Sequence, residues 1–323
     1  MSTTIKDVAK LSHVSVATVS RVINQKGYVN SETRAMVLEA IKELNYVPNE
    51  LARSLFQKKS SIIAVVVPHL TSDYFAELLE FIEDLTVNTN YRLMVCVTQD
   101  NTEKESKYLK IFDQYNIDGL ILISNTHRID DYKKLDIPIV EIDHNLAEDI
   151  PSITSNNFLG GKLAAEKLIN GGCKKIIHFR GPSDLVTVRE RTEGFKSILQ
   201  EKEIYNFSYD LDFKAPSADD IDNVIKSNLD CDGVFCDSDY IAVLAIQALQ
   251  RAGKKIPDEV QVIGFDDIEL ASVLKPNLTT ISQSRKSIGE YAVNSLMKLI
   301  NKEKLEFFHR QIDVELIERD TTK

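Results

Sequence analysis

The first 45 residues carry apolar side chains at the spacing of an α-helix. Three groups show this spacing: Ile5, Val8 and Ala9; Val19, Val22 and Ile23; and Val37, Ala40, Ile41 and Leu44. Each group forms one stripe along a helix, and Val14 lies in the polar turn after the first group. Asn30 or Ser31 can cap the third helix, and Asn45 with Pro48 ends it. The pattern predicts three helices that share one small core.

The second of these helices presents small side chains and one long cation on its outward face. These positions are Ser15, Val16, Ala17, Thr18, Ser20 and Arg21. Ser15 can also cap the helix by accepting a backbone N–H. Small side chains allow close approach to base edges, Val16 and Ala17 can touch thymine methyl groups, and Arg21 can give two parallel hydrogen bonds to guanine. We expect Ser15, Thr18 and Asn24 to bind phosphates. The alternative is a helical bundle that packs without binding DNA.

A short helix is expected after Pro48. Asn49 can cap residues 50–56, in which Leu51, Ala52 and Leu55 are apolar. A helix of two turns is unstable alone in water, so we expect this hinge to order only when two copies meet on DNA. Each Leu55 would then insert between base pairs in the minor groove. The alternative is a plain linker helix with Leu55 in the core of the following domain.

After residue 61 the pattern changes to apolar runs that alternate with amphipathic stretches. The apolar runs are 62–68, 93–98, 119–124, 139–143, 176–181, 234–237 and 262–266. The amphipathic stretches include 74–89, 103–115, 159–171, 190–202 and 239–252. Such apolar strands imply sheets covered on both faces, and the alternation predicts two doubly wound parallel sheets. We expect a crossing near 152–161, a return near 279–284 to a last helix at 288–301, and a strand at 311–318.

Polar and aromatic residues follow several of these strands. They are Tyr74, Phe75, Ser124, Asn125, Asp143, His144, Arg189, Arg191, Asp239 and Asp266. In open α/β sheets ligands bind beyond the carboxyl ends of strands, which predicts a cleft between the two lobes. Carboxylates, amides and guanidinium groups bind vicinal hydroxyls, and aromatic faces cover a sugar ring. Each residue also has a structural alternative: a helix cap for Asp239, core for Tyr74 and Phe75, and a solvated loop for His144.

The charge is distributed unevenly along the 323 residues. The net charge is −10, but residues 1–59 hold nine Lys or Arg against five Asp or Glu, which leaves −14 for the remainder. A basic head on an acidic body orients the head toward DNA phosphates. The four cysteines (Cys96, Cys173, Cys231 and Cys236) show no metal-binding spacing, so reduced thiols are expected and no metal or cofactor is predicted.

Other function classes find little support in the sequence. No stretch approaches twenty apolar residues and no signal pattern opens the chain, so we expect a cytoplasmic protein without membrane contact. A nucleophile elbow, a phosphate-binding glycine loop and a metal pattern are all missing, which argues against an enzyme. A sugar-binding transport protein shares the two lobes but needs an export signal.

The quoted motifs resemble one family over the whole chain. The run IKDVAKLSHVSVATVSRVINQKGYV followed by LNYVPNELARSL is similar to the head and hinge of the lactose- and galactose-repressor family, and PHLTSDYFAEL, IDGLILIS, GFDD and LTTISQ match later landmarks in order. The resemblance implies a three-helix helix-turn-helix domain (1–48), a hinge helix and linker (49–60), and a two-lobed periplasmic-binding-protein-like domain for effector and dimerisation (61–323). The first lobe would comprise about 61–155 plus 285–314, and the second about 156–284 plus the C-terminal end.

The resemblance also implies a repressor of sugar-utilisation genes that binds a near-palindromic operator as a homodimer. The DNA contacts expected are Thr4, Ser15, Val16, Ala17, Thr18, Arg21, Asn24, Tyr28, Asn49, Ala52 and Leu55. In the effector cleft the family pattern favours Arg191, Asp143 and Asp266, adds Gln283, and leaves Asp267 as structural. No heptad repeat follows the last predicted strand, so a dimer is expected. Ligand would close the lobes and unpair the hinge helices.

Effector identity depends on finer similarities. INQKGYV, RIDDYKKLDIPIVEIDHNLAEDIPSI and SNNFLGG resemble sucrose-type repressors more than ribose or purine repressors, so a sucrose- or fructose-containing sugar is expected. That subgroup tends to have an arginine where His144 stands, which puts the binding of a sugar phosphate in doubt. Two alternatives stay open: a catabolite-control regulator with a phosphorylated carrier protein as corepressor, and a sugar-binding protein without a regulatory role.

Overall fold

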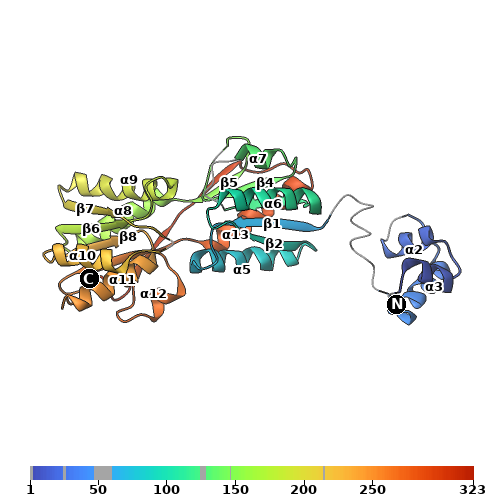
Figure 1. The fold of residues 1–323 in the computed structure, drawn as a ribbon, viewed down its shortest axis with the longest axis horizontal. Helices are drawn as coiled ribbons and strands as arrows, with labels where there is room; N and C mark the ends of the chain where they lie inside the picture. Colours follow the sequence, from blue (N-terminus) through green and yellow to red (C-terminus); the bar gives the residue numbers. More distant parts are fainter. Residues whose placement is uncertain (1–2, 25–26, 47–59, 124–128, 146, 214) are drawn as a thin grey trace. The chain divides into compact units, whose positions relative to one another are not determined.

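The computed structural model describes residues 3–24, 27–46, 60–123, 129–145, 147–213 and 215–323 (Figure 1). The chain divides into two compact units, residues 1–60 and 61–323. Each unit is described by itself.

The first unit contains the three predicted helices. They are α1 (Ile5–Leu11), α2 (Val16–Ile23) and α3 (Ser31–Glu43). Their apolar stripes form one core around the fully buried Val8, Val19 and Val37, as the spacing predicts. Ser15 caps α2 by accepting the backbone N–H of Thr18 at 3.1 Å. Asn30, rather than Ser31, caps α3 in the same way.

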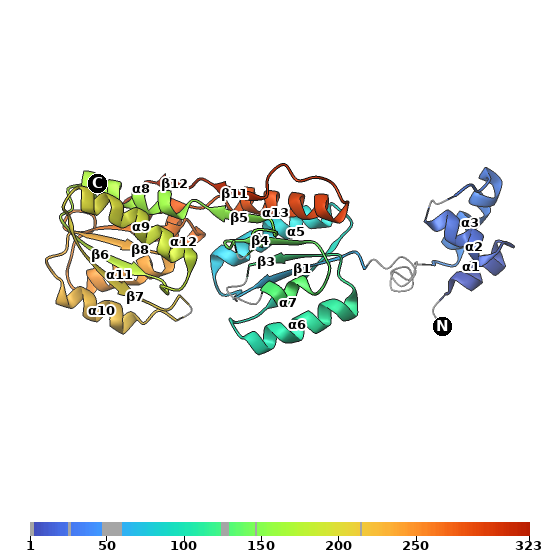
Figure 2. The same cartoon turned by 90° about the horizontal axis from the view of Figure 1, so that it is seen from above.

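The first lobe of the second unit is a six-stranded parallel sheet in the order β11-β5-β4-β3-β1-β2. The strands are β1 (Ile62–Val67), β2 (Arg92–Val97), β3 (Gly119–Leu122), β4 (Ile139–Ile142), β5 (Ser152–Ser155) and β11 (His309–Ile312). Its helices are α5 (Asp73–Val87), α6 (Thr102–Tyr115), α7 (Ile129–Lys133) and α13 (Arg285–Ile300). Helices α5 and α13 cover one face and α6 and α7 the other (Figure 2).

The second lobe has the sheet order β12-β10-β9-β8-β6-β7, in which β12 alone runs antiparallel to its neighbour. The strands are β6 (Lys175–Arg180), β7 (Tyr205–Asp210), β8 (Gly233–Cys236), β9 (Gln261–Asp266), β10 (Thr279–Ser282) and β12 (Glu315–Ile317). The helices are α8 (Asn157–Asn170), α9 (Val186–Glu201), α10 (Ala218–Ser227), α11 (Asp239–Arg251) and α12 (Glu269–Val273). Helices α8 and α9 cover one face, and α10 and α11 the other.

The chain crosses between the lobes three times in the described residues: after β5, after β10 and after β11. The first two crossings lie where the sequence predicts them. The prediction of one strand at 311–318 is wrong, because Ile312 packs into the first lobe's core while Val314 and Leu316 pack into the second lobe's core. One run of alternating apolar residues therefore contributes two short strands to two different sheets.

Candidate DNA-binding surface and effector site

The outward face of α2 leaves apolar side chains in solvent. Val16 is 41% exposed and Tyr28, beyond the helix, is 90% exposed, while Ala17 and Arg21 are also exposed. These side chains lie outside the core of the unit, because α2 contributes its opposite, apolar stripe to that core. A surface of this kind, with small residues and one guanidinium, fits a major groove.

The polar residues expected to contact DNA are held by local hydrogen bonds. Thr4 begins α1, and its hydroxyl donates to Asp7 at 2.7 Å, a contact that lowers the pKa of Asp7. The hydroxyls of Ser15 and Thr18 lie 2.9 Å apart, and the amide of Asn24 donates to the carbonyl of Ser20 at 2.8 Å. Hydroxyl and amide groups make more than one hydrogen bond each, so these contacts fix their positions without exhausting them. The predicted contacts Asn49, Ala52 and Leu55 lie outside the described residues.

A partly buried aspartate of the first lobe, Asp143, is the central residue of the candidate effector site. Asp143 directly follows β4, and its Oδ2 accepts a 3.1 Å hydrogen bond from the hydroxyl of Tyr74, near the start of α5. Its Oδ1 is buried without a hydrogen-bond partner among the described residues. Phe75 packs edge-on against Tyr74 with ring centroids 5.3 Å apart and stays half-buried. An unsatisfied buried carboxylate oxygen is suited to accept a ligand hydroxyl.

Arg191 provides the guanidinium of the site from the second lobe. It lies on α9, is 6% exposed, and stacks over the Phe265 ring at 3.6 Å. Its Nε donates to Oδ1 of Asn157 at 2.8 Å, and its Nη1 donates to the carbonyl of Asp237 at 2.6 Å. These contacts fix the plane of the guanidinium and use only part of its five N–H donors.

Helix α8 packs closely on α9, and this contact fixes the position of Arg191 on α9. A Cβ added to Gly161 would lie 2.0 Å from the carbonyl oxygen of Arg191, and one added to Gly194 would lie 2.0 Å from the carbonyl oxygen of Phe158. Both positions therefore require glycine, because the two helix backbones meet there.

Asp266 ends β9 and faces the same site from the second lobe. Its Oδ1 accepts a 2.7 Å hydrogen bond from Nε2 of Gln283, and the side chain stays partly accessible. Its backbone has a φ of 115°, in the region that favours glycine.

The charged groups of the two lobes affect one another's pKa values. Burial raises the pKa of Asp143 to about 6 and the pKa of Asp266 to about 6, and Arg191 opposes both increases. Asp143 further raises the pKa of Asp266, and the charges of both carboxylates raise the pKa of Tyr74 beyond the effect of burial. The four side chains are therefore close enough to interact, although they come from different lobes. Clustered carboxylates with perturbed pKa values are typical of binding sites.

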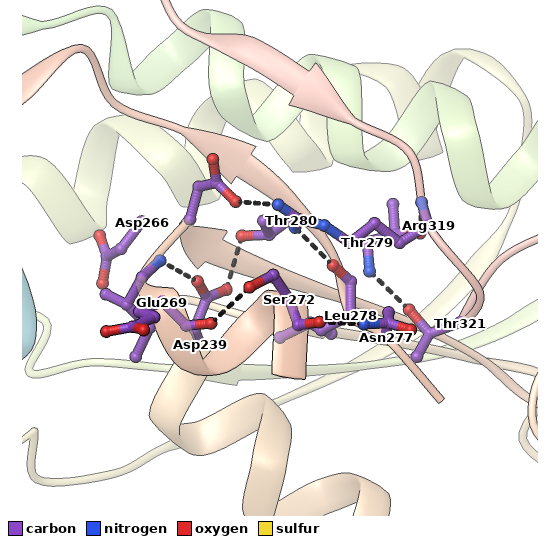
Figure 3. Close-up of polar contacts among 12 residues, drawn as sticks. Asp239, Asp266, Glu269, Ser272, Asn277, Leu278, Thr279, Thr280, Arg319 and Thr321 are labelled. Carbon is purple, nitrogen blue, oxygen red and sulfur yellow. Dashed lines mark hydrogen bonds and ion pairs between the residues drawn. The ribbon is translucent and has the colours of Figure 1, made fainter. Parts of the chain in front are cut away.

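Two other expected ligand contacts have internal partners instead. Asp239 is fully buried at the start of α11, and its carboxylate accepts hydrogen bonds from the backbone N–H of Ile268 at 2.9 Å and the hydroxyl of Thr280 at 2.5 Å (Figure 3). The structure thus gives Asp239 a packing role, and Ser238 caps α11 in its place. Arg189 is exposed and donates to the carbonyl of Asp184 at 2.7 Å.

Four expected ligand contacts remain: the structure describes His144 and Gln283 but not Ser124 and Asn125. His144 follows Asp143 and is buried, and Gln283 is joined to Asp266 as described. Ser124 and Asn125 lie outside the described residues. The sequence gives no strand-end signal for Asn157, which begins α8 and accepts a hydrogen bond from Arg191, or for Glu190, which precedes Arg191 on α9. Burial raises the pKa of Glu190, and this carboxylate in turn raises the pKa of Asp143.

The described residues contain no cluster of three or more His, Cys, Asp or Glu arranged to hold a metal ion. All four cysteines are free and buried, and burial raises the pKa of each thiol. Within the same described ranges, every helix is too short or too polar for a bilayer crossing.

Two family descriptions match the chain. Residues 4–49 match "Bacterial regulatory proteins, lacI family", and residues 165–322 match "Periplasmic binding protein-like domain". The chain is 40% identical over 322 residues to a ribose operon repressor of Halalkalibacterium halodurans, which covers 99% of this chain and 97% of that protein. It is 37% identical over 296 residues to a sucrose operon repressor of Streptococcus mutans, covering 91% and 92%.

A solved structure matches over the full length. The crystal structure of the lac repressor dimer bound to operator and the anti-inducer ONPF superposes with a TM-score of 0.89 at 26% identity, covering 100% of this chain and 99% of that one. A sucrose operon repressor is thus among the relatives, as the sequence suggests. The ribose operon repressor matches at higher identity over more of the chain, so the comparison does not favour sucrose over ribose.

Proposed function

Because this chain belongs to the lacI family of bacterial regulatory proteins, we propose that it represses sugar-utilisation genes under the control of a neutral sugar bound between its lobes. It is a DNA-binding transcriptional repressor with a helix-turn-helix head and an α/β domain of the periplasmic-binding type. Our proposal concerns the identity of the effector, the residues that contact it, and the way its binding changes the affinity for DNA.

One observation carries the effector proposal: Oδ1 of Asp143 in the first lobe is buried without a hydrogen-bond partner among the described residues. Groups of the second lobe lie near it, because Arg191 acts to lower the pKa of Asp143 and Asp143 acts to raise the pKa of Asp266. A sugar between the lobes would donate one hydroxyl to the unpartnered Oδ1 of Asp143 and another to Asp266. Arg191 would donate to a sugar oxygen through the N–H groups that Asn157 and Asp237 leave free. Hydrogen bonds to charged groups are stronger than neutral ones, which favours a polyhydroxy ligand.

Charge favours a sugar without a phosphate group. Among the described residues of the site, Asp143, Asp266 and Glu190 carry carboxylates, and the guanidinium groups of Arg191 and Arg285 lie near them, so the carboxylates outnumber the cations. A phosphate would add negative charge beside these buried carboxylates, and like charges in a desolvated site repel strongly. The names of the relatives, ribose and sucrose operon repressors, agree with an unmodified sugar.

On the DNA side we infer a homodimer that reads a near-palindromic operator in the cytoplasm. The exposed side chains of α2 enter the major groove, and Thr4, Ser15, Thr18 and Asn24 bind phosphates. The proposed division of the chain stays as the resemblance implies it, with a head at 1–48, a hinge at 49–60 and an effector domain at 61–323. The Leu55 wedge remains a prediction from the sequence.

A binding-site selection from random duplexes, followed by effector titration, tests this function. The full-length protein selects an operator, and its affinity for that operator is measured with D-ribose, D-fructose, sucrose and their phosphates. We expect a palindromic consensus and a change in affinity with one unmodified sugar, with coupling of about 1–3 kcal/mol. A response to a phosphorylated sugar alone, or only to a phosphorylated carrier protein, would overturn the neutral-sugar effector. Sugar binding without operator selection would indicate a sugar-binding protein with no regulatory role.

A further inference from the structure

The side chain of Arg285 joins the two lobes beside the candidate effector site. Arg285 is the first residue of α13, directly after the crossing from β10. Its Nε lies 2.9 Å from Oε2 of Glu77 on α5, in the first lobe. Its Nη1 donates to the backbone carbonyl of Asp266, and its Nη2 donates to the carbonyl of Asp267 at 2.9 Å, both in the second lobe. One guanidinium, 11% exposed, therefore holds three segments together.

The two carbonyls belong to a turn that needs external support. Asp266 and Asp267 have φ values of 115° and 56°, in the region that L-residues other than glycine seldom adopt. Such residues persist where their surroundings hold them. Arg319 holds the carboxylate of Asp267 at 2.6 Å, while Arg285 holds the carbonyls. Figure 3 shows Asp266 together with Arg319, whose side chain reaches the adjacent Asp267.

Helix α5 is linked to both aspartates of the site, directly to the carboxylate of Asp143 and through Arg285 to the backbone of Asp266. Tyr74, near its start, donates directly to Asp143, and Glu77, one turn later, meets Arg285, which holds the backbone of Asp266. Helix α5 also packs along α13 in the core of the first lobe. A shift of the Asp266 turn on ligand binding would therefore move the guanidinium of Arg285 and, with it, α5. A planar guanidinium with several fixed N–H donors couples the two segments more rigidly than a flexible ammonium group would.

We propose that Arg285 is a positioning residue of this repressor: it orients Asp266 for the effector and, through Glu77, transmits effector occupancy to α5 of the first lobe. This inference rests on the proposed effector role of Asp266. The contact with Glu77 is an ion pair at Nε, whereas Nη1 and Nη2 donate hydrogen bonds to the two carbonyls, so substitutions can separate the two functions.

The test compares Arg285→Met, Arg285→Lys and Glu77→Gln in the full-length protein, with Lys286→Met and Glu83→Gln as controls. Lys286 and Glu83 are exposed neighbours on the same two helices. Calorimetry gives the Kd for D-ribose, D-fructose or sucrose, whichever binds the wild type. Operator affinity with and without that sugar gives the coupling factor, and thermal unfolding gives Tm. By linkage, operator must change sugar affinity by the same factor, which checks each value.

Arg285→Met should weaken sugar binding about tenfold or more, because the Asp266 turn loses both donors. Lysine lacks the two-pronged guanidinium, so Arg285→Lys should lose most of the same affinity while keeping part of the coupling through Glu77. Glu77→Gln should keep sugar affinity within about twofold and lower the coupling factor severalfold. Both controls should match the wild type.

Wild-type sugar affinity in Arg285→Lys together with wild-type coupling in Glu77→Gln would overturn the inference, whatever happens to Tm. If Arg285→Met fails to fold, Arg285→Lys and Glu77→Gln still test the inference. A wild-type protein that binds none of the sugars would instead contradict the proposed function, and the role of Arg285 would fall with it.

Discussion

The hydroxyl of Tyr74 donates a 3.1 Å hydrogen bond to one carboxylate oxygen of Asp143, and the other oxygen is buried without a hydrogen-bond partner among the described residues. Leaving a buried acceptor unsatisfied destabilises the protein, and a ligand hydroxyl removes that cost. A sugar hydroxyl bound at this oxygen would supply the missing partner.

Asp143→Asn should separate binding from stability. The amide keeps the shape but removes a desolvated charge, so we expect sugar affinity to fall by about 10- to 100-fold while Tm at neutral pH stays equal or rises. Calorimetry and thermal unfolding measure the two effects. A lower Tm with unchanged sugar affinity would instead assign Asp143 a purely structural role.

The raised pKa values predict the pH dependence of sugar binding. Asp143 and Asp266 titrate near 6, and their charged forms are the better acceptors for sugar hydroxyls. Sugar binding should lower both pKa values, so affinity is highest above pH 6 and falls as pH decreases through 6. Calorimetry in buffers of different ionisation enthalpy should detect proton release near pH 6. Asp266→Asn should flatten the profile, and an unchanged profile in that variant would contradict this assignment.

The same groups affect the stability of the unliganded domain. Their folded pKa values lie above the unfolded values of about 4. Their contribution to stability is thus fully present below pH 4 and is lost as pH rises through 6. Saturating sugar should reduce this loss, because it favours the charged carboxylates.

Gly161→Ala tests the helix contact that positions Arg191. The added Cβ would meet backbone atoms at 2.0 and 2.7 Å, so α8 and α9 must separate. We expect a loss of about 1–3 kcal/mol in the free energy of unfolding and weaker sugar binding. The matched control is Gly289→Ala on α13, where the nearest atom is a Phe81 side-chain carbon at 3.3 Å. Equal unfolding curves for both variants would refute the close-contact argument.

Arg21→Ala tests the DNA-binding face. Loss of a two-pronged contact to guanine should weaken operator binding by about 1–3 kcal/mol and relax the base preference at one position of each half-site. Lys42→Ala removes an equal charge from an exposed position on α3 and serves as the control. Gel shifts with single-base operator variants measure both. If the two variants lose affinity equally on every sequence, Arg21 contributes only to phosphate attraction.

Much of the fold follows from local periodicity. The helical stripes around Val8, Val19 and Val37 form one core, and the apolar runs become strands that are covered on both faces. The strand Tyr205–Asp210 was missed because it lies at a sheet edge and its side chains are polar, aromatic and largely accessible. The prediction of one strand at 311–318 was wrong because periodicity does not show which of the two lobes' cores each apolar residue packs into.

The site was predicted less completely. The rule of strand ends points equally to Asp143, Asp239 and Asp266. Only the fold shows that Asp239 is fully buried and accepts hydrogen bonds from Ile268 and Thr280, which come from distant parts of the sequence. Arg285 begins a helix, so no strand end points to it. Its role depends on three segments that only the folded chain brings together.

Arg191→Met gives the most direct measurement of the central claim, that a sugar held between the lobes controls operator affinity. Operator binding is titrated with and without the sugar that binds the wild type, with Arg189→Met as the control, because Arg189 is exposed and bonded to Asp184. We predict that Arg191→Met binds operator with wild-type affinity and does not respond to sugar, while Arg189→Met responds normally. A full sugar response in Arg191→Met, or loss of its operator binding without sugar, would contradict the account.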